Sequence, residues 1–407
     1  MNVVISHPAA PPFTQAVLHA LHESRQLKRF YTSLAFSAEQ LKNKPWQQML
    51  RNRTISGIPA CYIRNFYLAE CCRLASGKID RSGVWTDRVW EWSEHWFDRQ
   101  VANALNSEVD ACYSYEHICE STFQRAKELG IRTFYDVPAP ETTQIRNLMA
   151  QEISNFPEMD NLWFQKTSER EPKRLARRKR EWELADTIIC ASPFTRDTFA
   201  AVGYDTSKVK IVPYGAPEPI SQESCRTGGT SETNKLNLIW AGTFSLRKGA
   251  HYLLEAWRQS DAGKFAELHV YGSSELPTTL ADGNTAGISF KGAISRDTLM
   301  SRYEQADALI FPTLYDGFGM VVTEALSRGC PVITTHKAGA SSFIRSGENG
   351  FIIDHANATA ISECLEHCRT NRTELKTMRE AARHSAARWQ WSDYRKALLE
   401  KIKPVTS

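Results

Sequence analysis

Two adjacent cations, Arg247 and Lys248, stand at the start of a predicted helix that carries Leu253, Leu254 and Trp257 on one face. A helix N-terminus disfavours positive charge, so two cations are favourable there only when an anion comes to lie beside them. A diphosphate would pair with both side chains and with the free backbone N–H groups of the first turn. These residues therefore predict a diphosphate site, and a solvated basic turn is the alternative.

A second cluster with possible chemistry opens a later predicted helix. Gly317 and Gly319 let the backbone approach a ligand closely, and the N–H groups at the helix start point outward as donors. Asp316 precedes this helix, whereas Glu324 lies inside it among apolar neighbours. A buried carboxylate needs donors, which the two hydroxyls of a ribose would supply. Helix capping by Asp316 together with an internal ion pair of Glu324 is the alternative.

Shorter loops follow three other predicted strands, and they contain Gly242 and Thr243, Ser273, and Ile294. Ligands of open parallel sheets bind beyond the carboxyl ends of the strands, so these loops belong to the same candidate region. The backbone groups of Ser273 and Ile294 could hold a nucleobase.

The elements that must position these residues alternate regularly in the second half of the chain. Strands are predicted at 236–242, 267–272, 287–292, 307–312 and 331–335, and helices at 248–258, 296–305 and 318–329. Strands that alternate with helices of about ten residues indicate right-handed βαβ crossovers and a doubly wound parallel sheet. The second half is therefore predicted to be α/β and Rossmann-like.

The first half follows a looser version of the same plan. Strands are predicted at 3–5, 133–137, 187–191 and 209–212, and helices at 169–183 and 194–201. Residues 216–234 have the Pro, Ser, Thr and Gly content of a linker. We expect domains at 1–214 and 215–390, with a C-terminal helix at 391–407 that packs back toward the N-terminal domain.

Composition limits the class of protein. The 407 residues are 42% hydrophobic and 24% charged, which excludes a disordered, collagen-like or disulfide-scaffold chain. The net charge of +4 gives no global signal for nucleic-acid binding. The ten cysteines include no CxxC pair and are expected to be buried free thiols of a reducing compartment. No apolar run is long enough to span a membrane and the start resembles no secretion signal, so we expect a cytoplasmic protein.

Residues 40–100 combine tryptophans with cations, a mixture that suits a surface in contact with phospholipid headgroups or an anionic lipid-linked substrate. The tryptophans are Trp46, Trp85, Trp90, Trp92 and Trp96, and the cations are Lys42, Lys44, Arg51, Arg53, Arg64, Arg73, Lys78, Arg81, Arg88 and Arg99. An insert that packs its tryptophans inward is the alternative. The charged run KRLARRKREWE in the helix at 169–183 is expected to be a solvated face, or a second approach to an anionic membrane.

The segment from Leu236 to Asp354 resembles the retaining glycosyltransferase family 4, through LIWAGTFSLRKGAHYLLEAW, FKGAISRDTLMSRYEQADALIFPTLYDGFGMVVTEALSRGCPVITT and GENGFIID. A weaker resemblance extends upstream through ELADTIICASPFTRDTFAAVGYDTSKVKIVPYG. The resemblance implies the GT-B architecture, in which two Rossmann-like domains with doubly wound parallel sheets face an interdomain cleft.

The resemblance also implies roles for residues of the second half. Arg247 and Lys248 would bind the diphosphate of the donor, and the backbone of Gly317, Phe318, Gly319, Met320 and Val321 would meet the diphosphate and the sugar. Asp316 and Glu324 fall on the E-x7-E motif of the family, the first near the reacting sugar and the second on the ribose. Asp316 is a shorter acid than the family carries there, and Thr243 stands near the place of a frequent arginine.

The N-terminal half matches the family less well. His7 and Pro8 stand where many relatives have a Gly-Gly loop, and this acceptor-side loop is a site candidate. Tyr135 and Asp136 stand where a histidine is common, which makes Asp136 the candidate for a catalytic group of this half. A turn-capping aspartate before proline is the alternative. His117, at another strand-to-helix junction, is expected to be structural.

The predicted reaction is transfer of a hexosyl group from a nucleotide sugar to a glycan or lipid-linked acceptor, with retention of the anomeric configuration by resemblance. No DxD-type acidic pair follows a strand, so we predict metal-independent transfer without a cofactor. The expected partners are a nucleotide sugar, a surface-polysaccharide acceptor and the inner face of the cytoplasmic membrane, but no nucleic acid. A nucleotide-sugar epimerase and a non-catalytic nucleotide-sugar-binding or scaffold subunit remain alternatives.

Overall fold

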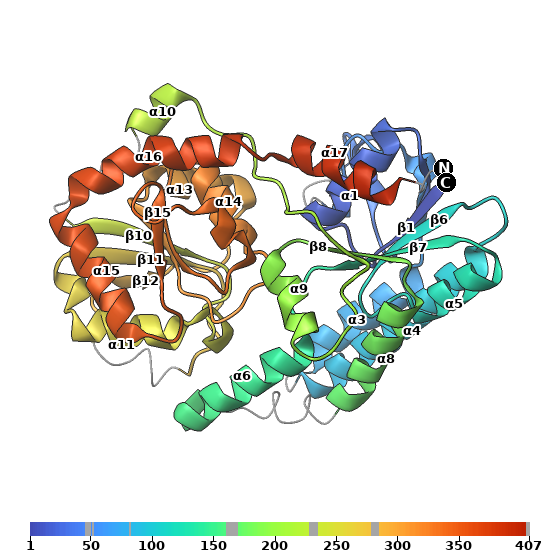
Figure 1. Ribbon diagram of the computed structural model, residues 1–407, viewed down its shortest axis with the longest axis horizontal. Helices are drawn as coiled ribbons and strands as arrows, with labels where there is room; N and C mark the ends of the chain where they lie inside the picture. The colour runs from blue at the N-terminus through green and yellow to red at the C-terminus, as the bar shows by residue number, and fades with distance from the viewer. Residues whose placement is uncertain are drawn as a thin grey trace.

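The computed structural model describes residues 1–44, 50, 53–80, 83–159, 170–227, 235–277 and 285–403. Two parallel sheets form two separate lobes (Figure 1). The first sheet has the strand order β5-β2-β1-β6-β7-β8-β9, and the second has the order β12-β11-β10-β13-β14-β15. Trp46, Arg51 and Arg81, and residues 228–234 of the predicted linker, lie outside the described residues.

The first lobe is built from short apolar strands that are covered on both faces. Its sheet comprises β1 (Val3–Ser6), β2 (Leu27–Thr32), β5 (Ile63–Asn65), β6 (Ala111–Tyr115), β7 (Arg132–Val137), β8 (Thr187–Cys190) and β9 (Val209–Ile211). Its helices are α1 (Pro12–Glu23), α2 (Ala38–Leu41), α3 (Tyr67–Ile79), α4 (Val84–Ala104), α5 (Glu120–Glu128), α6 (Thr142–Asn155), α8 (Glu171–Leu184) and α9 (Pro193–Ala200). Strands β3 (Phe36–Ser37) and β4 (Thr54–Ile55) pair as a small separate sheet.

The second lobe has the predicted alternation of strands and helices. Its sheet comprises β10 (Leu236–Ala241), β11 (Ala266–Tyr271), β12 (Ile288–Phe290), β13 (Ala308–Phe311), β14 (Val332–Thr335) and β15 (Gly350–Ile353). Its helices are α10 (Gln222–Thr227), α11 (Ala250–Gln259), α13 (Arg296–Gln305), α14 (Met320–Ser327), α15 (Ala358–Thr370) and α16 (Arg372–Ala387). Strand β13 is buried at all four positions, as a strand covered by helices on both faces must be.

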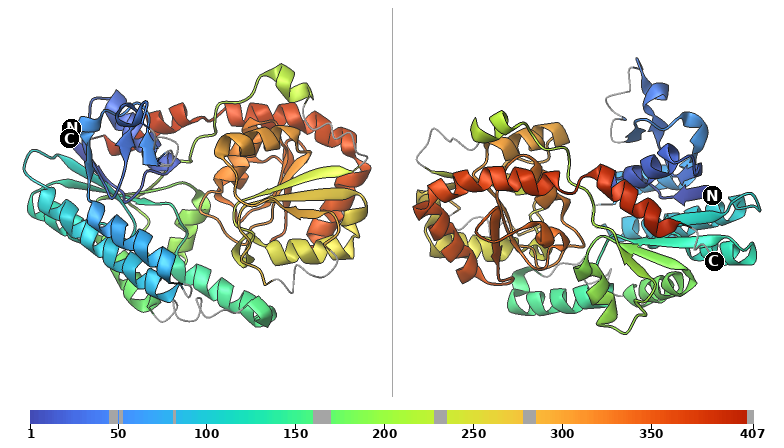
Figure 2. Two further views of the ribbon diagram at one scale, coloured as in Figure 1. Left: turned by 180° about the vertical axis from the view of Figure 1, so that it is seen from behind. Right: turned by 45° about the horizontal axis from the view of Figure 1, so that its top comes forward.

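Two connections cross between the lobes side by side (Figure 2). The chain leaves the first lobe after Tyr214 and returns into helix α17 (Trp391–Ile402), which packs against α1. The two crossings are bonded to each other, because Ala216 N donates to Trp389 O at 3.0 Å and Trp391 N donates to Ala216 O at 3.3 Å. Gly215 is required here, since a Cβ at this position would lie 2.2 Å from Trp391 N.

The arginine run of α8 is solvated only in part. Lys173, Lys179 and Arg180 are exposed as expected, whereas the expectation of a solvated face is wrong for the three paired arginines that follow. A membrane contact of this helix stays a prediction. Arg174 donates to Asp87 at 2.6 Å, Arg177 donates to Asp98 at 2.7 Å and Arg178 contacts Glu116 at 3.1 Å. The partners Asp87 and Asp98 belong to α4, so the run fixes α8 to a neighbouring helix. Such pairing is needed because a buried charge without a partner has a large desolvation free energy.

The burial of the cysteines agrees only in part with the prediction. All ten cysteines are free, and seven are buried as predicted. The prediction of burial is wrong for Cys61 and Cys71, which are exposed, while Cys72 is half-buried. Within the described part of the chain, none of the helices combines the length and apolarity needed to cross a bilayer.

Candidate active site

The predicted diphosphate residues lie together at the carboxyl edge of the second sheet. Lys248 Nζ donates to Asp316 Oδ2 at 3.0 Å, and Arg247 Nη1 lies 3.4 Å from the same oxygen. Burial alone would raise the pKa of Asp316, but the charges of Lys248 and Arg247 hold it below its ordinary value. Burial lowers the pKa of Lys248, with Asp316 opposing the shift. The loop after β10 is thus joined to the loop after β13.

Glycine brings these loops into close contact. Gly249 has φ +74°, and a Cβ on it would lie 2.1 Å from Pro312 O. Gly319, with φ +81°, stands at the N-cap of α14. Gly317 has no room for a side chain either, since its Cβ would lie 2.0 Å from Pro138 O in the first lobe. Gly249 and Gly317 therefore permit close contact between the loops and between the lobes, whereas the predicted approach of a ligand to Gly317 and Gly319 stays a prediction.

The Gly317 carbonyl is the point where the first lobe holds the start of α14. Ser192 Oγ and Thr195 Oγ1, at the start of α9, donate to it at 2.7 and 3.1 Å. The Phe318 N–H donates to Asp316 Oδ1 at 3.2 Å, which aligns the acid with the helix N-terminus. Met320 and Val321 are half-buried in the first turn of α14. The helix start is therefore fixed from both lobes.

Glu324 has a partner that was not predicted from the sequence. Arg296, the first residue of α13, contacts Glu324 Oε1 through Nη2 at 3.0 Å and through Nε at 3.1 Å. Glu324 is only 8% exposed, and burial raises its pKa while Arg296 opposes the shift. Arg296 is a cation at a helix N-terminus, the same signal that singled out Arg247 and Lys248. The internal ion pair named as the alternative for Glu324 is present.

The remaining donor-side candidates line the same edge of the sheet. Gly242 has φ +98° and its N–H donates to Tyr271 O, while Phe244 N donates to the carbonyl of Ser273, each at 2.8 Å. Thr243 is half-buried between these contacts. Ile294, after β12, lines a cavity of about 390 Å³ together with other residues of β10, β11 and α13. The predicted residues are thus held together on neighbouring loops.

Asp136 is not brought into contact with Asp316. Its carboxylate is 1% exposed and accepts from Tyr113 OH at 2.5 Å. Burial raises the pKa of Asp136 to about 7, with the Tyr113 hydrogen bond opposing the shift. Among the described residues its other oxygen and the hydroxyls of Tyr115, Tyr214 and Tyr394 have no hydrogen-bond partner. The catalytic role of Asp136 stays a prediction, and the structure places the group in a buried tyrosine cluster.

The acceptor-side loop follows β1. His7 Nδ1 lies 3.0 Å from Ala9 N, its ring packs against Tyr115, and burial lowers its pKa to about 4. Pro8 O accepts from Thr32 Oγ1 at 3.2 Å. A series of ring contacts, His7 to Phe13, Phe13 to Tyr214 and Tyr214 to Phe318, links this loop to the donor side. The loop after β1 and the loop after β13 therefore border one region between the lobes.

Helix α6 of the first lobe contacts α11 of the second lobe, and this contact was also not predicted from the sequence. The buried carboxylate of Glu152 lies 3.1 Å from His251 Nε2 and accepts from Tyr252 OH at 2.9 Å. His251 and Tyr252 begin α11, three and four residues after Lys248. A lone acid in an otherwise unremarkable helix gave no signal of this contact.

Comparison with known proteins relates the second lobe to a described family. Residues 222–385 match the family of glycosyl transferases group 1. This group 1 region contains the whole cluster around Arg247, Asp316 and Glu324.

Individual relatives match parts of the chain. The chain is 26% identical over 266 residues to a D-inositol 3-phosphate glycosyltransferase of Corynebacterium urealyticum, and this match covers 59% of this chain and 62% of the relative. It is 25% identical over 173 residues to the capsular polysaccharide biosynthesis glycosyltransferase CapM of Staphylococcus aureus, covering 39% of this chain and 46% of the relative. The chain thus spans less than two thirds of the length of these relatives.

The fold likeness extends beyond the group 1 region to the whole chain. The structure of HepE from Anabaena in complex with UDP superposes with a TM-score of 0.60 over 99% of both chains, at 13% sequence identity. The fold is therefore GT-B, with two Rossmann-like parallel-sheet domains. This confirms the fold class predicted from the sequence.

Proposed function

We propose that the protein is a retaining, metal-independent hexosyltransferase that moves a sugar from a nucleotide-diphosphate sugar to a glycan or lipid-linked acceptor. The observation that carries the proposal is the joining of Arg247, Lys248 and Asp316 beside the N-terminus of α14. A cluster of this kind concentrates positive charge and backbone donors where a diphosphate can lie.

The chemistry needs charge stabilisation on the departing diphosphate. Arg247, Lys248 and the N–H groups at the start of α14 supply it without a metal ion. Removal of one preorganised donor of this type typically costs about 2.7 to 4 kcal/mol of barrier lowering. Asp316 pairs with both cations. The donor diphosphate would take over part of this pairing and leave Asp316 to meet the sugar.

Glu324 supports recognition of the nucleoside. Its pairing with Arg296 keeps a buried carboxylate oriented at the edge of the second sheet. A ribose with two hydroxyls can donate to such a carboxylate. The resemblance to retaining transferases supports this role for Glu324, and by the same resemblance we propose that Asp316 lies near the reacting carbon.

The acceptor hydroxyl would approach from the first lobe, whose loop at Pro138 contacts Gly317. Closure of the lobes around both substrates positions the hydroxyl and excludes water. In a front-face reaction the departing phosphate takes the proton of the attacking hydroxyl, so that no separate base is needed. The region between the lobes is where the loops of His7 and Asp316 converge through their ring contacts.

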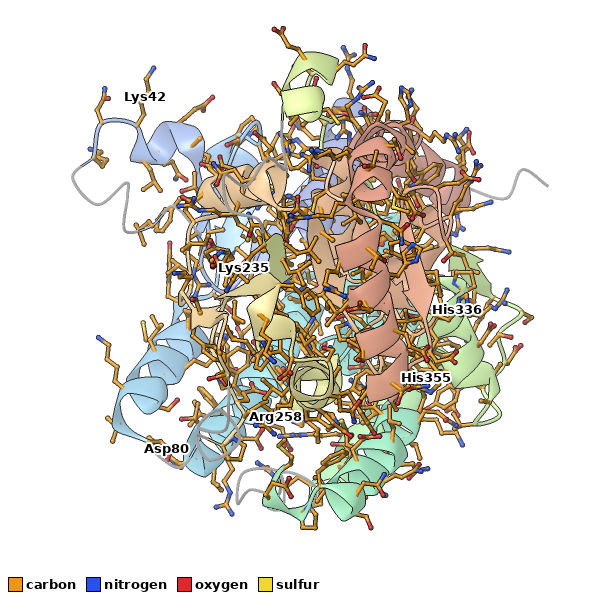
Figure 3. The ribbon with its side chains drawn as sticks, turned by 90° about the vertical axis from the view of Figure 1, so that its left-hand side faces the viewer. Lys42, Asp80, Lys235, Arg258, His336 and His355 are labelled. Atoms are coloured by element: carbon orange, nitrogen blue, oxygen red, sulfur yellow. The ribbon has the colours of Figure 1, made fainter. Side chains whose placement is uncertain are left out.

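A role in surface-polysaccharide synthesis at the membrane is the finer part of the proposal. Helices α3 and α4 expose the large apolar side chains Tyr67, Leu68, Leu74, Ile79, Trp85, Trp90 and Trp92, which we call the α3–α4 surface. The cations Arg64, Lys78, Arg88 and Arg99 are exposed on or beside these helices. Figure 3 shows Asp80, where α3 ends, at the periphery of the molecule. Trp96 instead packs inward against Phe66, so the packed-insert alternative holds for this tryptophan, whereas Trp85, Trp90 and Trp92 are exposed.

The test is a thermal-shift panel of UDP-, GDP- and ADP-sugars on the purified protein, followed by nucleoside diphosphate release without acceptor. One donor should stabilise the protein and release its diphosphate slowly, with equal rates in EDTA and in magnesium. Release that requires magnesium would contradict metal independence. Failure of every donor to bind would contradict the transferase proposal and favour a scaffold role.

A further inference from the structure

A cavity of about 340 Å³ lies in the first lobe between α4 and α8. Thr86, Trp90 and Glu94 line it from the first half of α4, Arg174 lines it from α8, and His117 lines it from the loop after β6. The loop after β6 stands at the carboxyl edge of the first sheet, the edge whose next loop contacts Gly317. The cavity therefore lies in the lobe that would hold the acceptor.

The strong charges around this cavity are already neutralised in pairs. Arg174 Nη2 lies 2.6 Å from Asp87 and 3.2 Å from Glu91, and Arg170 lies 3.1 Å from Glu91. Two arginines thus balance two carboxylates. Because neither sign of charge is in excess in this group, it fits neither a phosphate nor a metal ion.

Other polar groups in the wall have capacity for a neutral ligand. Thr86 Oγ1 is buried without a hydrogen-bond partner among the described residues, and Glu94 lies in the same wall. Burial raises the pKa of Glu94 to about 7, with Arg177 and Arg174 opposing the shift, so the group can donate or accept near neutral pH. His117 Nε2 accepts from Arg178 Nε at 3.1 Å, and burial, followed by the charge of Arg178, lowers the pKa of His117 well below its ordinary value. These are the partners that sugar hydroxyls need.

An aromatic side chain completes the wall. Trp90 is 44% exposed, and the Arg73 guanidinium lies 3.4 Å from the centroid of its ring. One ring face is thus covered by Arg73, and the rest of the indole is available to the cavity. An aromatic surface beside a few polar groups is a typical arrangement for binding a ligand that has an apolar face and polar edges.

We propose that this cavity binds one sugar ring of the acceptor, with Trp90 as its platform and Thr86, Glu94 and His117 as partners of its hydroxyls. The inference rests on the proposed transferase function and deepens it. The same helix carries the exposed Trp85, so a sugar attached to a membrane lipid could enter the cavity while its lipid stays in the bilayer. The sugar can also belong to a free glycan, and the two sources differ in what they contact outside the cavity.

The test is saturation-transfer NMR with methyl and octyl glycosides of glucose, galactose, mannose and N-acetylglucosamine. The intact wild-type chain should bind at least one of them. Thr86→Val should weaken that binding about 2- to 10-fold through loss of one hydrogen bond. Trp90→Ala should weaken it at least as much, and Trp90→Phe should restore part of the loss. Thr377→Val, on the exposed face of α16, is the matched control and should bind as the wild type does.

The outcomes separate the inference from the proposed function. Binding of UDP or GDP, measured on the same samples, should be equal in all these variants, because the cavity lies in the other lobe. If no glycoside binds, or if Thr86→Val and Trp90→Ala bind as tightly as the wild type, the sugar site is overturned even though nucleotide binding persists. Stronger binding of octyl than of methyl glycosides would identify a lipid-linked source, and equal binding would identify a free glycan.

Discussion

Lys248 Nζ and Asp316 Oδ2 lie 3.0 Å apart and join the loops that follow two adjacent parallel strands, β10 and β13. The pair is largely buried, so neither partner can be removed without leaving the other in an unfavourable environment. A donor diphosphate that arrives here gives Lys248 a second anion. The pair therefore holds the cation in position before the substrate binds.

Lys248→Ala should weaken binding of the nucleotide sugar about 10- to 100-fold, because a charge-assisted contact of this type is worth about 1.5 to 3 kcal/mol. Isothermal calorimetry with the donor that gives the largest thermal shift measures the change. Lys264→Ala is the matched control, since Lys264 is exposed and pairs with Asp261 away from the site. Equal affinity in Lys248→Ala and the wild type would exclude Lys248 from the diphosphate site.

Glu324→Gln should cost both turnover and recognition of the ribose. We expect the wild type to bind a 2′,3′-dideoxynucleoside diphosphate about 10-fold more weakly than the ribonucleotide, because the carboxylate loses charge-assisted hydrogen bonds to the hydroxyls. The variant should discriminate much less between the two ligands. A variant that discriminates as the wild type does would place Glu324 outside the ribose site and leave it as the structural partner of Arg296.

Asp136→Asn should change how stability depends on pH. The pKa of Asp136 in the folded protein is about 7, above its ordinary value, so between about pH 4 and 7 the native state binds more protons than the unfolded state. Its contribution is therefore lost as pH rises through this window, by roughly 4 kcal/mol at most. Urea unfolding at pH 5 and pH 8 should show a smaller difference in the variant than in the wild type. Asp197→Asn, on the exposed side of α9, should keep the wild-type difference, and the same slope in Asp136→Asn would refute the assignment.

The α3–α4 surface should bind liposomes that contain anionic phospholipid, and this binding should weaken as salt is raised from 50 to 500 mM, since headgroup attraction is screened over a Debye length of about 10 Å or less. Replacing Trp85 and Trp92 together by serine should abolish most of the sedimentation with liposomes. Phe290→Ser removes an equally exposed aromatic from the second lobe and should have no effect. Absence of wild-type binding at low salt would contradict the membrane contact.

The sequence predicted the second lobe well because its strands are continuous apolar runs. Residues Ala308–Phe311 are buried at every position, and the loop that follows them could be recognised from its glycines and acid. The partner of Glu324 was missed, although Arg296 carries the same signal as Lys248, a cation at the start of a helix. Local chemistry therefore identified the residues, and only the fold paired them.

The first lobe was harder to predict because its key contacts join segments far apart in the chain. The surroundings of Asp136 include Tyr394 of α17 and Tyr214. Burial, followed by the charges of Asp136 and Tyr394, raises the pKa of Tyr214 well above its ordinary value. Arg174 and Arg177 of α8 looked like part of a solvated run because the acids that pair with them lie about 80 residues earlier, on α4. The hydrophobic periodicity of a single segment does not indicate ion pairs with residues far away in the chain.

The paired crossings at Ala216 and Trp391 also determine how the gene can be recombined. The first lobe consists of two pieces of chain, one from each end, with the second lobe inserted between them. A chimera that exchanged everything after Tyr214 would import a foreign α17 onto α1, and the mismatched interface would damage the recipient lobe. Donor specificity is therefore best transplanted as an internal cassette with two junctions, which leaves both ends of the original polypeptide in place.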